Sequence, residues 1–175
     1  MTYTYHYNSP LGGITLASDG VALTGLWFDG QKYFGDTLSA PYEEKFLSIF
    51  GQTVHWLDIY FSGKSPDFTP PLLMQTTPFR KEVWKILLTI PYGQTTTYGE
   101  IANKLITQNG KMSAQAIGSA VGHNSISIII PCHRVVGSNG NLTGYAGGID
   151  KKLKLLMLER ANTSSLFIPK KGTAL

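Results

Sequence analysis

The sequence has one cysteine, few charged residues and no long hydrophobic run. A single cysteine, Cys132, among 175 residues excludes an internal disulfide and a cysteine-rich zinc site. No apolar run reaches the length that spans a bilayer, and the N-terminus lacks the basic and apolar regions of a secretory signal. These absences predict a cytoplasmic location. The composition, 42% hydrophobic and 15% charged, is typical of a folded globular protein with one large or two small domains.

Charge is distributed unevenly along the chain. Up to Gln75 there are three lysines against seven acids, a net charge of −4; from Thr76 onward there are twelve lysines or arginines against four acids, a net charge of +8. The two values recover the overall +4. A basic second half indicates that this half meets a polyanion. A basic surface that serves only solubility explains the charge equally well, so the charge alone leaves both interpretations open.

The first half, residues 1–75, has the pattern of a small antiparallel sheet with helices. Aromatic residues alternate with threonine or histidine from Tyr3 to Tyr7, and the turn residues Ser18-Asp19-Gly20 separate two further runs. No cluster of ligating side chains occurs here, so we expect a scaffold domain without a metal site. Strands are expected at 3–7, 14–17 and 21–28, helices at 41–50 and 53–61, and an extended proline-rich segment at 67–72.

The second half, residues 76–175, contains well-defined helix starts. Thr77 followed by Pro78 suits an N-cap and a first helical position. Thr97 and Glu100 have the spacing of a capping box. Two short helices joined by a polar turn in a basic region resemble a helix-turn-helix. The expected helices span 78–90, 98–105 and 113–122.

The helix expected at 113–122 is unusually rich in small residues, which let its backbone approach a neighbour closely. Packing against another helix is the ordinary explanation. A helix laid into a narrow groove of nucleic acid is the functional one, and with so few long side chains it would bind with little sequence preference. The small residues are Ser113, Ala114, Ala116, Gly118, Ser119, Ala120 and Gly122.

The last part of the chain predicts a glycine-rich loop and a final helix. The loop at 144–148 lacks the lysine and hydroxyl residue of a phosphate-binding loop, which favours a pocket wall made of backbone. The helix is expected at 151–160, with Leu153, Leu156 and Met157 facing inward and lysines facing outward. On spacing alone, Glu159 near its end is a solvated acid.

Cys132 lies in the most informative stretch of the sequence. The β-branched run 128–130 predicts the end of a buried strand, and Pro131 is expected to stop the pairing. An imidazole and a guanidinium, from His133 and Arg134, follow the thiol, and nearby positive charge favours the nucleophilic thiolate. A lone cysteine is more often a small buried apolar residue. The Pro-Cys-His-Arg context favours a functional thiol.

Several motifs of the second half occur together in one order. They are Thr77-Pro78-Phe79-Arg80, Val83-Trp84, Ile90-Pro91-Tyr92-Gly93, Thr97-Tyr98-Gly99-Glu100-Ile101-Ala102, Asn124, Pro131-Cys132-His133-Arg134-Val135, Gly144-Tyr145-Ala146-Gly147-Gly148, and Leu155-Leu156 with Glu159. In these motifs the chain resembles the methylated-DNA–protein-cysteine methyltransferases, a DNA-repair family that removes alkyl groups from O6 of guanine. Pro-Cys-His-Arg-Val with a downstream Gly-Tyr-x-Gly-Gly is highly specific, and the motifs cover nearly half the chain.

The resemblance implies a fold and a partner. The fold is α/β (α+β): residues 1–75 form an RNase H-like antiparallel sheet with helices, and residues 76–175 form a winged helix-turn-helix-like domain that carries the cysteine. The partner is double-stranded DNA that contains O6-alkylguanine, with O4-alkylthymine as a further candidate substrate. The protein binds the minor groove as a monomer, flips the base and is spent after one transfer. No cofactor or metal is implied.

The resemblance also implies roles for individual residues. Cys132 accepts the alkyl group in one displacement, His133 deprotonates it through a water, and Glu159 orients that histidine. Asn124 braces the turn before the site. Tyr98 donates a proton toward the leaving guanine. The expected DNA-binding residues are Tyr98, Gly99, Gln115, Ser138 and Arg134, and the expected pocket residues are Val135, Tyr145, Ala146 and Gly147.

The sequence departs from the family pattern at two positions. Gln115 stands where the family usually has an arginine that fills the gap left by the flipped base, so we expect weaker or slower flipping. Ser125 follows Asn124 where proline is usual, which loosens the turn without removing activity. The stretch 104–111 is slightly longer than in many members. The competing hypotheses are a damage sensor that no longer transfers and a thiol hydrolase that uses Cys132 and His133.

Overall fold

The computed structural model describes residues 1–110 and 112–169, which form two compact units. The first unit contains Met1–Gln75 and Ser125–Ile129; the second contains Thr76–Asn124 and the residues from Ile130 onward. The chain passes from the first unit to the second after Gln75, and residues 125–129 return to the first unit. The domain bounds 1–75 and 76–175 stay a prediction. Lys111 and residues 170–175, which belong to the expected second domain, lie outside the described residues.

A four-stranded sheet with the order β3-β2-β1-β4 forms the first unit. Its first three strands are an antiparallel meander, with Tyr5 opposite Leu16 and Leu16 opposite Leu26, as the alternating sequence predicts. The short fourth strand pairs parallel to the first, so the sheet is not purely antiparallel. The strands are β1 (Thr2–Ser9), β2 (Gly12–Ser18), β3 (Leu23–Phe28) and β4 (Tyr42–Glu44).

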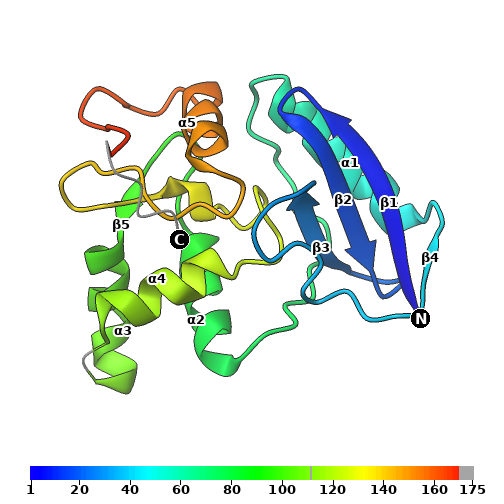
Figure 1. The fold of residues 1–175 in the computed structure, drawn as a ribbon, viewed down its shortest axis with the longest axis horizontal. Helices are drawn as coiled ribbons and strands as arrows, with labels where there is room; N and C mark the ends of the chain where they lie inside the picture. The colour runs from blue at the N-terminus through cyan, green and yellow to red at the C-terminus, as the bar shows by residue number, and fades with distance from the viewer. Residues whose placement is uncertain (111, 170–175) are drawn as a thin grey trace. The chain divides into compact units, whose positions relative to one another are not determined.

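Two helices were expected after the sheet, but the described chain has one helix there, α1 (Ser48–Phe61), preceded by β4. The predicted helix at 41–50 is wrong over its first half, because that segment pairs with the exposed edge of β1. The helix then continues without a break, since its buried positions keep helical spacing throughout. Figure 1 shows α1 lying along one face of the sheet. Its buried residues are Ile49, Phe50, Thr53, Trp56, Leu57 and Tyr60.

The predicted strand at 128–130 does not form, although all three isoleucines are buried. The residues just before it, 125–127, join the edge of β3 through one bridge. Leu26 N donates to Ser125 O (2.8 Å), and Ser127 N donates to Leu26 O (2.9 Å). The chain then turns, with Ile128 at a φ of 69°. A β-branched residue disfavours that conformation, so local packing overrides its strand propensity.

The second unit contains three helices whose starts agree with the sequence. Thr77 Oγ1 accepts from Arg80 N (3.3 Å), Thr97 and Glu100 form the expected capping box, and Ser113 caps the third helix. The first ends earlier and the second later than predicted. The helices are α2 (Pro78–Leu87), α3 (Tyr98–Asn109) and α4 (Ala114–Gly122).

In Figure 1, α4 crosses between α2 and α3, and both pack against it. Its buried side chains are Ile117, Ala120 and Val121, and Trp84 Nε1 donates to Ala120 O (2.9 Å). Two short parallel strands, β5 (Thr96–Thr97) and β6 (Val135–Val136), pair the start of α3 with the segment after the cysteine. These contacts place the helix-turn-helix and the cysteine in one unit.

The last helix, α5 (Ile149–Leu158), begins two residues before its predicted start. Leu156 is buried and Leu153 half-buried, as expected, and Leu155 is buried as well, but Met157 is 61% exposed and Lys152 is fully buried. Both predictions for those two side chains are therefore wrong. Lys152, Leu155 and Leu156 are spaced by three and four residues, so one helix face carries them inward together. None of the described helices is both long and apolar enough to cross a membrane.

Candidate active site

Cys132 begins a short 3₁₀ helix, η1 (Cys132–Arg134), and its side chain is only 5% exposed. The amide of Asn124, just beyond α4, donates to Ile130 O (2.8 Å) and to Sγ of Cys132 (3.2 Å). Cys132 N also donates to Ile130 O (2.8 Å). Hydrogen bonds from Asn124 and from Cys132 to Ile130 O therefore hold the turn that precedes the thiol. A hydrogen bond to sulfur stabilises the thiolate more than the thiol.

His133 and Glu159 form a fully buried pair. Nε2 of His133 lies 2.5 Å from Oε2 of Glu159, which is the C-cap residue of α5. Arg134 donates through Nε to Oε1 (2.8 Å) and through Nη2 to Oε2 (3.2 Å), and Gly93 N donates to Oε1 (3.1 Å). The carboxylate is surrounded by donors. The solvated Glu159 suggested by spacing alone is wrong.

The environment fixes the charge states of this cluster. Burial acts to raise the pKa of Glu159, but hydrogen bonds from His133 and Arg134 outweigh it and lower the pKa below its ordinary value. Burial also lowers the pKa of His133, and the bond to Glu159 opposes this only in part. Glu159 is thus ionised and His133 neutral at physiological pH. Because the carboxylate can only accept, the imidazole hydrogen lies on Nε2 and the lone pair on Nδ1.

The thiol is less acidic than the sequence predicts. Burial raises the pKa of Cys132, and the Asn124 hydrogen bond and the charge of Lys152 oppose that rise. The guanidinium of Arg134 was expected to supply positive charge, but it is bound to Glu159 and to Ile90 O (2.6 Å). The cation that acts on the thiol is Lys152, which the sequence analysis missed. Its spacing from Leu155 and Leu156 is the signal that could have found it.

Tyr98 is held near the same centre. Its hydroxyl donates to Thr143 O (3.2 Å), and Nζ of Lys152 donates to the same oxygen (2.8 Å). Burial, and after it the charge of Cys132, raises the pKa of Tyr98 to about 12. The phenol therefore keeps its proton at physiological pH. One backbone carbonyl thus links α3 and α5.

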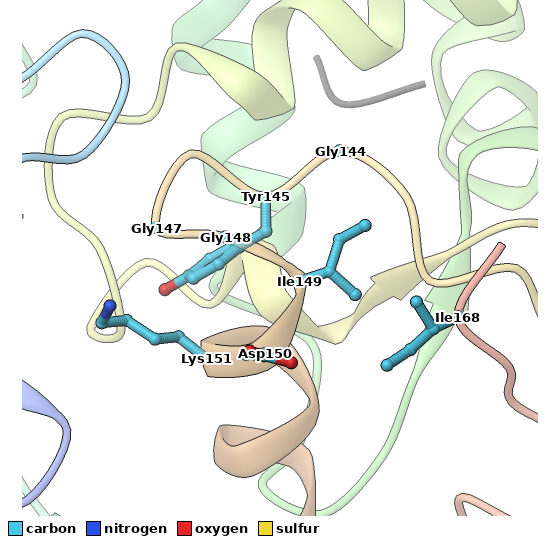
Figure 2. A pocket seen from close by; sticks show the side chains of 8 residues that line it. All are labelled: Gly144, Tyr145, Gly147, Gly148, Ile149, Asp150, Lys151 and Ile168. Carbon is cyan, nitrogen blue, oxygen red and sulfur yellow. The ribbon is translucent and has the colours of Figure 1, made fainter. Parts of the chain in front are cut away.

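The glycine-rich loop borders a pocket of about 410 Å³. Of the four residues expected to hold the base, Tyr145 and Gly147 line this pocket, whereas Val135 and Ala146 are not among its lining residues. Figure 2 shows the loop backbone with Tyr145 directed away from Ile168. The Tyr145 ring also lies edge-on to the His133 ring, with centroids 6.5 Å apart. Cys132 is not among the residues that line this pocket, and the role of the four expected residues in holding a base stays a prediction.

Of the five residues expected to contact DNA, Tyr98 is half-buried with its hydroxyl on Thr143 O, and the other four fall into two groups. Gly99, Gln115 and Ser138 are exposed, at the start of α3, in the first turn of α4 and in the turn after β6. Arg134 is different, because it is 8% exposed and its guanidinium donates to Glu159 and Ile90. Its geometry favours a contact inside the protein over the expected contact with DNA.

Comparison with known families identifies both halves of the chain. Residues 78–161 match the family model for the DNA-binding domain of 6-O-methylguanine DNA methyltransferase, and residues 1–74 match the model for its ribonuclease-like domain. The chain belongs to this family. Membership confirms the expected fold class and the expected kind of enzyme, a DNA-repair methyltransferase whose acceptor is a cysteine of the protein.

Individual relatives agree with this assignment. The chain is 44% identical to the methylated-DNA–protein-cysteine methyltransferase of Mycobacterium bovis over 89% of its length and 93% of the relative. It is 44% identical to that of Methanosarcina mazei over 91% and 98%. The crystal structure of the Mycobacterium tuberculosis O6-methylguanine methyltransferase has a TM-score of 0.80 at 41% identity, covering 98% of this chain and 97% of that one.

A second Mycobacterium tuberculosis structure, of OGT in complex with DNA, has a TM-score of 0.78 at 43% identity and covers 91% of this chain and 92% of that one. DNA is thus the partner of a relative similar to this chain over most of its length. Within residues 1–110 and 112–169, no group of three or more histidine, cysteine or acidic side chains is arranged to hold a metal. The absence of a metal or cofactor stays a prediction.

Proposed function

We propose that the protein repairs DNA by moving the alkyl group of a flipped-out O6-alkylguanine to Sγ of Cys132, once per molecule. The observation that carries this proposal is the buried thiol bonded to Asn124, next in sequence to the buried His133–Glu159 pair. A nucleophile, a base and an orienting acid are the parts that such a displacement requires. All lie within the matched DNA-binding domain.

The proton of Cys132 leaves first. It passes through a water to Nδ1 of His133, and Glu159 stabilises the imidazolium that forms. The thiolate then attacks the alkyl carbon. The new S–C bond forms as the C–O6 bond breaks, and the electron pair stays on guanine. Arg134 acts as a positioning residue, because it keeps Glu159 ionised and fixed.

Tyr98 supplies the proton that guanine needs on leaving. Burial, and after it the charge of the Cys132 thiolate, raises the pKa of Tyr98 to about 12. Alkylation removes that charge from Cys132, so the phenol becomes more acidic at the stage when the leaving base must be protonated. The same group thus resists ionisation before the transfer and gives up its proton after it.

Because Cys132 is only 5% exposed, its sulfur cannot reach O6 of a guanine stacked inside a duplex. The nucleotide must be extruded, which costs a few kcal/mol, roughly. We assign the contact with the minor groove to the open face of α4. A Cβ added at Gly118 or Gly122 would meet no atom within 4 Å, so packing inside the protein does not require these glycines. Their smallness instead permits close approach of a narrow groove.

The groove contact has its own test. A bulky side chain on the open face of α4, in the variant Gly118→Leu, should weaken binding to a DNA duplex about tenfold or more while leaving the unfolding temperature near that of wild type. Binding is measured by fluorescence anisotropy at fixed salt. Equal affinity in the variant would move the groove contact away from α4. The monomeric state and the cytoplasmic location stay predictions.

Intact-protein mass spectrometry tests the transfer. The full chain is incubated with a duplex containing one O6-methylguanine. We expect one methyl group per molecule, located on Cys132 by peptide mapping, and none in Cys132→Ser. Tight binding without an adduct would favour a damage sensor. Turnover of esters or amides without an adduct would favour a thiol hydrolase.

A further inference from the structure

The chain that follows α5 returns to the turn that follows β6. Leu142 N donates to Phe167 O (2.9 Å), and Phe167 N donates to Gly140 O (3.0 Å). We call residues 163–168 the C-terminal segment and residues 137–142 the wing turn. The two hydrogen bonds form a parallel β-bridge, so the C-terminal segment is attached to the wing turn as a short added strand.

Gly140 is the residue of the wing turn that permits this close contact. A Cβ at Gly140 would lie 2.1 Å from Ser165 O, a backbone atom, and the φ of 88° disfavours any other residue. Gly137 N donates to Asn141 O (2.9 Å) and Gly140 N donates to Gly137 O (2.9 Å). The wing turn is therefore held by its own hydrogen bonds and by the C-terminal segment.

Leu166 adds apolar packing to these hydrogen bonds. Its side chain is half-buried against the core cluster of Val136, Leu142 and Leu156. Val136 belongs to β6, and β6 pairs with the strand that leads into α3. Leu156 belongs to α5. The cluster thus connects the C-terminal segment with the strand before the wing turn and with α5.

The outer part of the wing turn is exposed and uncharged. Ser138 and Asn139 are exposed, and residues 135–149 contain no lysine, arginine or acid. A hydroxyl and an amide bind phosphate oxygens through hydrogen bonds, which require a definite geometry. A turn that became ordered only on binding would lose conformational freedom and affinity. A turn fixed in advance therefore binds a DNA backbone more tightly.

We propose that the C-terminal segment is a positioning element for DNA binding, which fixes the wing turn so that Ser138 and Asn139 donate hydrogen bonds to phosphate oxygens of the duplex. The proposal rests on the proposed function, because the duplex is the partner named there. The wing turn lies within residues 78–161, which match the DNA-binding domain, and the C-terminal segment lies beyond them. An element outside the matched domain thus fixes a contact surface inside it.

Two leucines provide a matched pair of variants. Leu166 and Leu153 are both half-buried against the same cluster, but only Leu166 belongs to the C-terminal segment. Binding of the full chain to an unmodified duplex is measured by fluorescence anisotropy. We expect Leu166→Ala to weaken binding about fivefold or more, and Leu153→Ala to stay within about twofold of wild type. Equal losses would overturn the proposal, because a shared loss of core packing would then explain them.

A second pair of variants isolates the hydrogen bond to Gly140. Phe167→Pro removes the N–H that donates to Gly140 O, whereas Phe167→Ala keeps this N–H and removes only the ring. We expect only Phe167→Pro to weaken duplex binding, about fivefold or more. The same loss in Phe167→Ala would contradict the proposal, because the ring and not the hydrogen bond would then matter.

The salt dependence of binding identifies what the C-terminal segment holds. The wing turn carries no charge, so the variants should bind DNA less tightly with an unchanged slope of affinity against salt. Lys170 and Lys171 follow the C-terminal segment in the sequence. A reduced slope in Phe167→Pro would mean that the segment presents these charges to DNA, and it would rule out the role proposed for the wing turn.

Methyl transfer separates this proposal from the proposed function. Single-turnover transfer from an O6-methylguanine duplex is measured over a range of DNA concentrations. In Leu166→Ala and Phe167→Pro the half-saturating concentration should rise about fivefold, while the maximal rate stays within about twofold of wild type. A lower maximal rate at an unchanged half-saturating concentration would overturn the proposal. If wild type binds DNA but transfers no methyl group, the proposed function fails, and the binding measurements still decide the role of the C-terminal segment.

Discussion

A histidine–carboxylate pair in each unit shows how much burial changes the same contact. In the first unit, His6 Nε2 lies 2.6 Å from Asp29 Oδ2, and both side chains are 45% exposed. In the second, His133 Nε2 lies 2.5 Å from Glu159 Oε2, and both are fully buried. The distances are nearly equal. Water screens the charge of the Asp29 carboxylate in the first pair. The charge of the buried Glu159 carboxylate in the second pair acts on the neighbouring groups with little screening.

The same contrast extends to the buried polar residues of each unit. In the part of the chain that the structure describes, the buried polar side chains of the first unit are uncharged, whereas most of those in the second are ionisable. An uncharged group is satisfied by one or two hydrogen bonds, but a buried charge needs a partner. The first set is Thr4, Ser18, Thr24, Gln31, Thr53, Ser125 and Ser127; the second is Asn124, His133, Arg134, Lys152 and Glu159.

The largest expected difference lies between Glu159→Gln and its matched control Asp29→Asn. An amide offers one acceptor oxygen to donors that now share two, and it leaves Arg134 as an uncompensated buried charge. We expect Glu159→Gln to lower the unfolding free energy by about 3 to 5 kcal/mol and the transfer rate on the order of a hundredfold or more. Urea unfolding and single-turnover adduct formation measure these effects.

Asp29→Asn makes the same chemical change at the exposed pair. It should lower the unfolding free energy by less than about 1 kcal/mol and leave transfer unchanged. Equal losses in the two variants would break the comparison, because burial would then not separate the pairs.

Lys152→Met should have the opposite effect on stability. The pKa of Lys152 falls from 10.5 to about 8 on folding, so the charged form opposes folding. Removing the charge should raise the unfolding free energy by up to about 3 kcal/mol. The full gain is expected below about pH 8, and the gain should fade as pH rises toward 10.5. Urea unfolding at several pH values measures this gain. Lys154→Met, at an exposed position, should change stability by less than about 0.5 kcal/mol.

Lowering the pH should remove the stabilisation that ionised Glu159, the acid of the buried pair, gives to the fold. The pKa of Glu159 in the folded protein lies below its ordinary value of 4.5, so its ionised form stabilises the fold above pH 4.5. That stabilisation is lost as pH falls below 4.5 toward the folded-state pKa, by about 1.4 kcal/mol per pH unit. The difference in urea-unfolding free energy between wild type and Glu159→Gln should therefore shrink toward low pH. A constant difference would show that Glu159 is not ionised in the folded protein.

The smallest expected effect concerns an exposed glutamine in each unit. Gln115→Arg adds charge to the first turn of α4, and Gln52→Arg adds the same charge to α1 in the first unit. Only the former should tighten DNA binding, roughly three- to tenfold at low salt, and steepen the salt dependence by about one counterion. Fluorescence anisotropy over a salt series measures both. Equal effects would mean that charge alone, not the α4 surface, decides DNA binding.

The sequence was informative where its signals are local. Caps at Thr77, Thr97 and Ser113 involve hydrogen bonds within three residues, so the helix starts were predictable. Alternation likewise predicted the first three strands. The Pro-Cys-His-Arg motif pointed to the thiol and, through family resemblance, to His133, Glu159 and Asn124 as its partners.

Tertiary contacts decided which charges are buried and what they face. Arg134 binds Ile90, 44 residues earlier, and Glu159, 25 residues later, and no local pattern records such pairings. The sequence by itself predicted the acceptor thiol and the starts of the helices around it. Only the tertiary structure decided that the Arg134 guanidinium binds Glu159 instead of acting on the thiol. It also decided that Lys152 is buried and that Ile128 lies in a turn and not in a strand. Burial depends on which distant segments meet, and burial sets the charge and acidity of these groups.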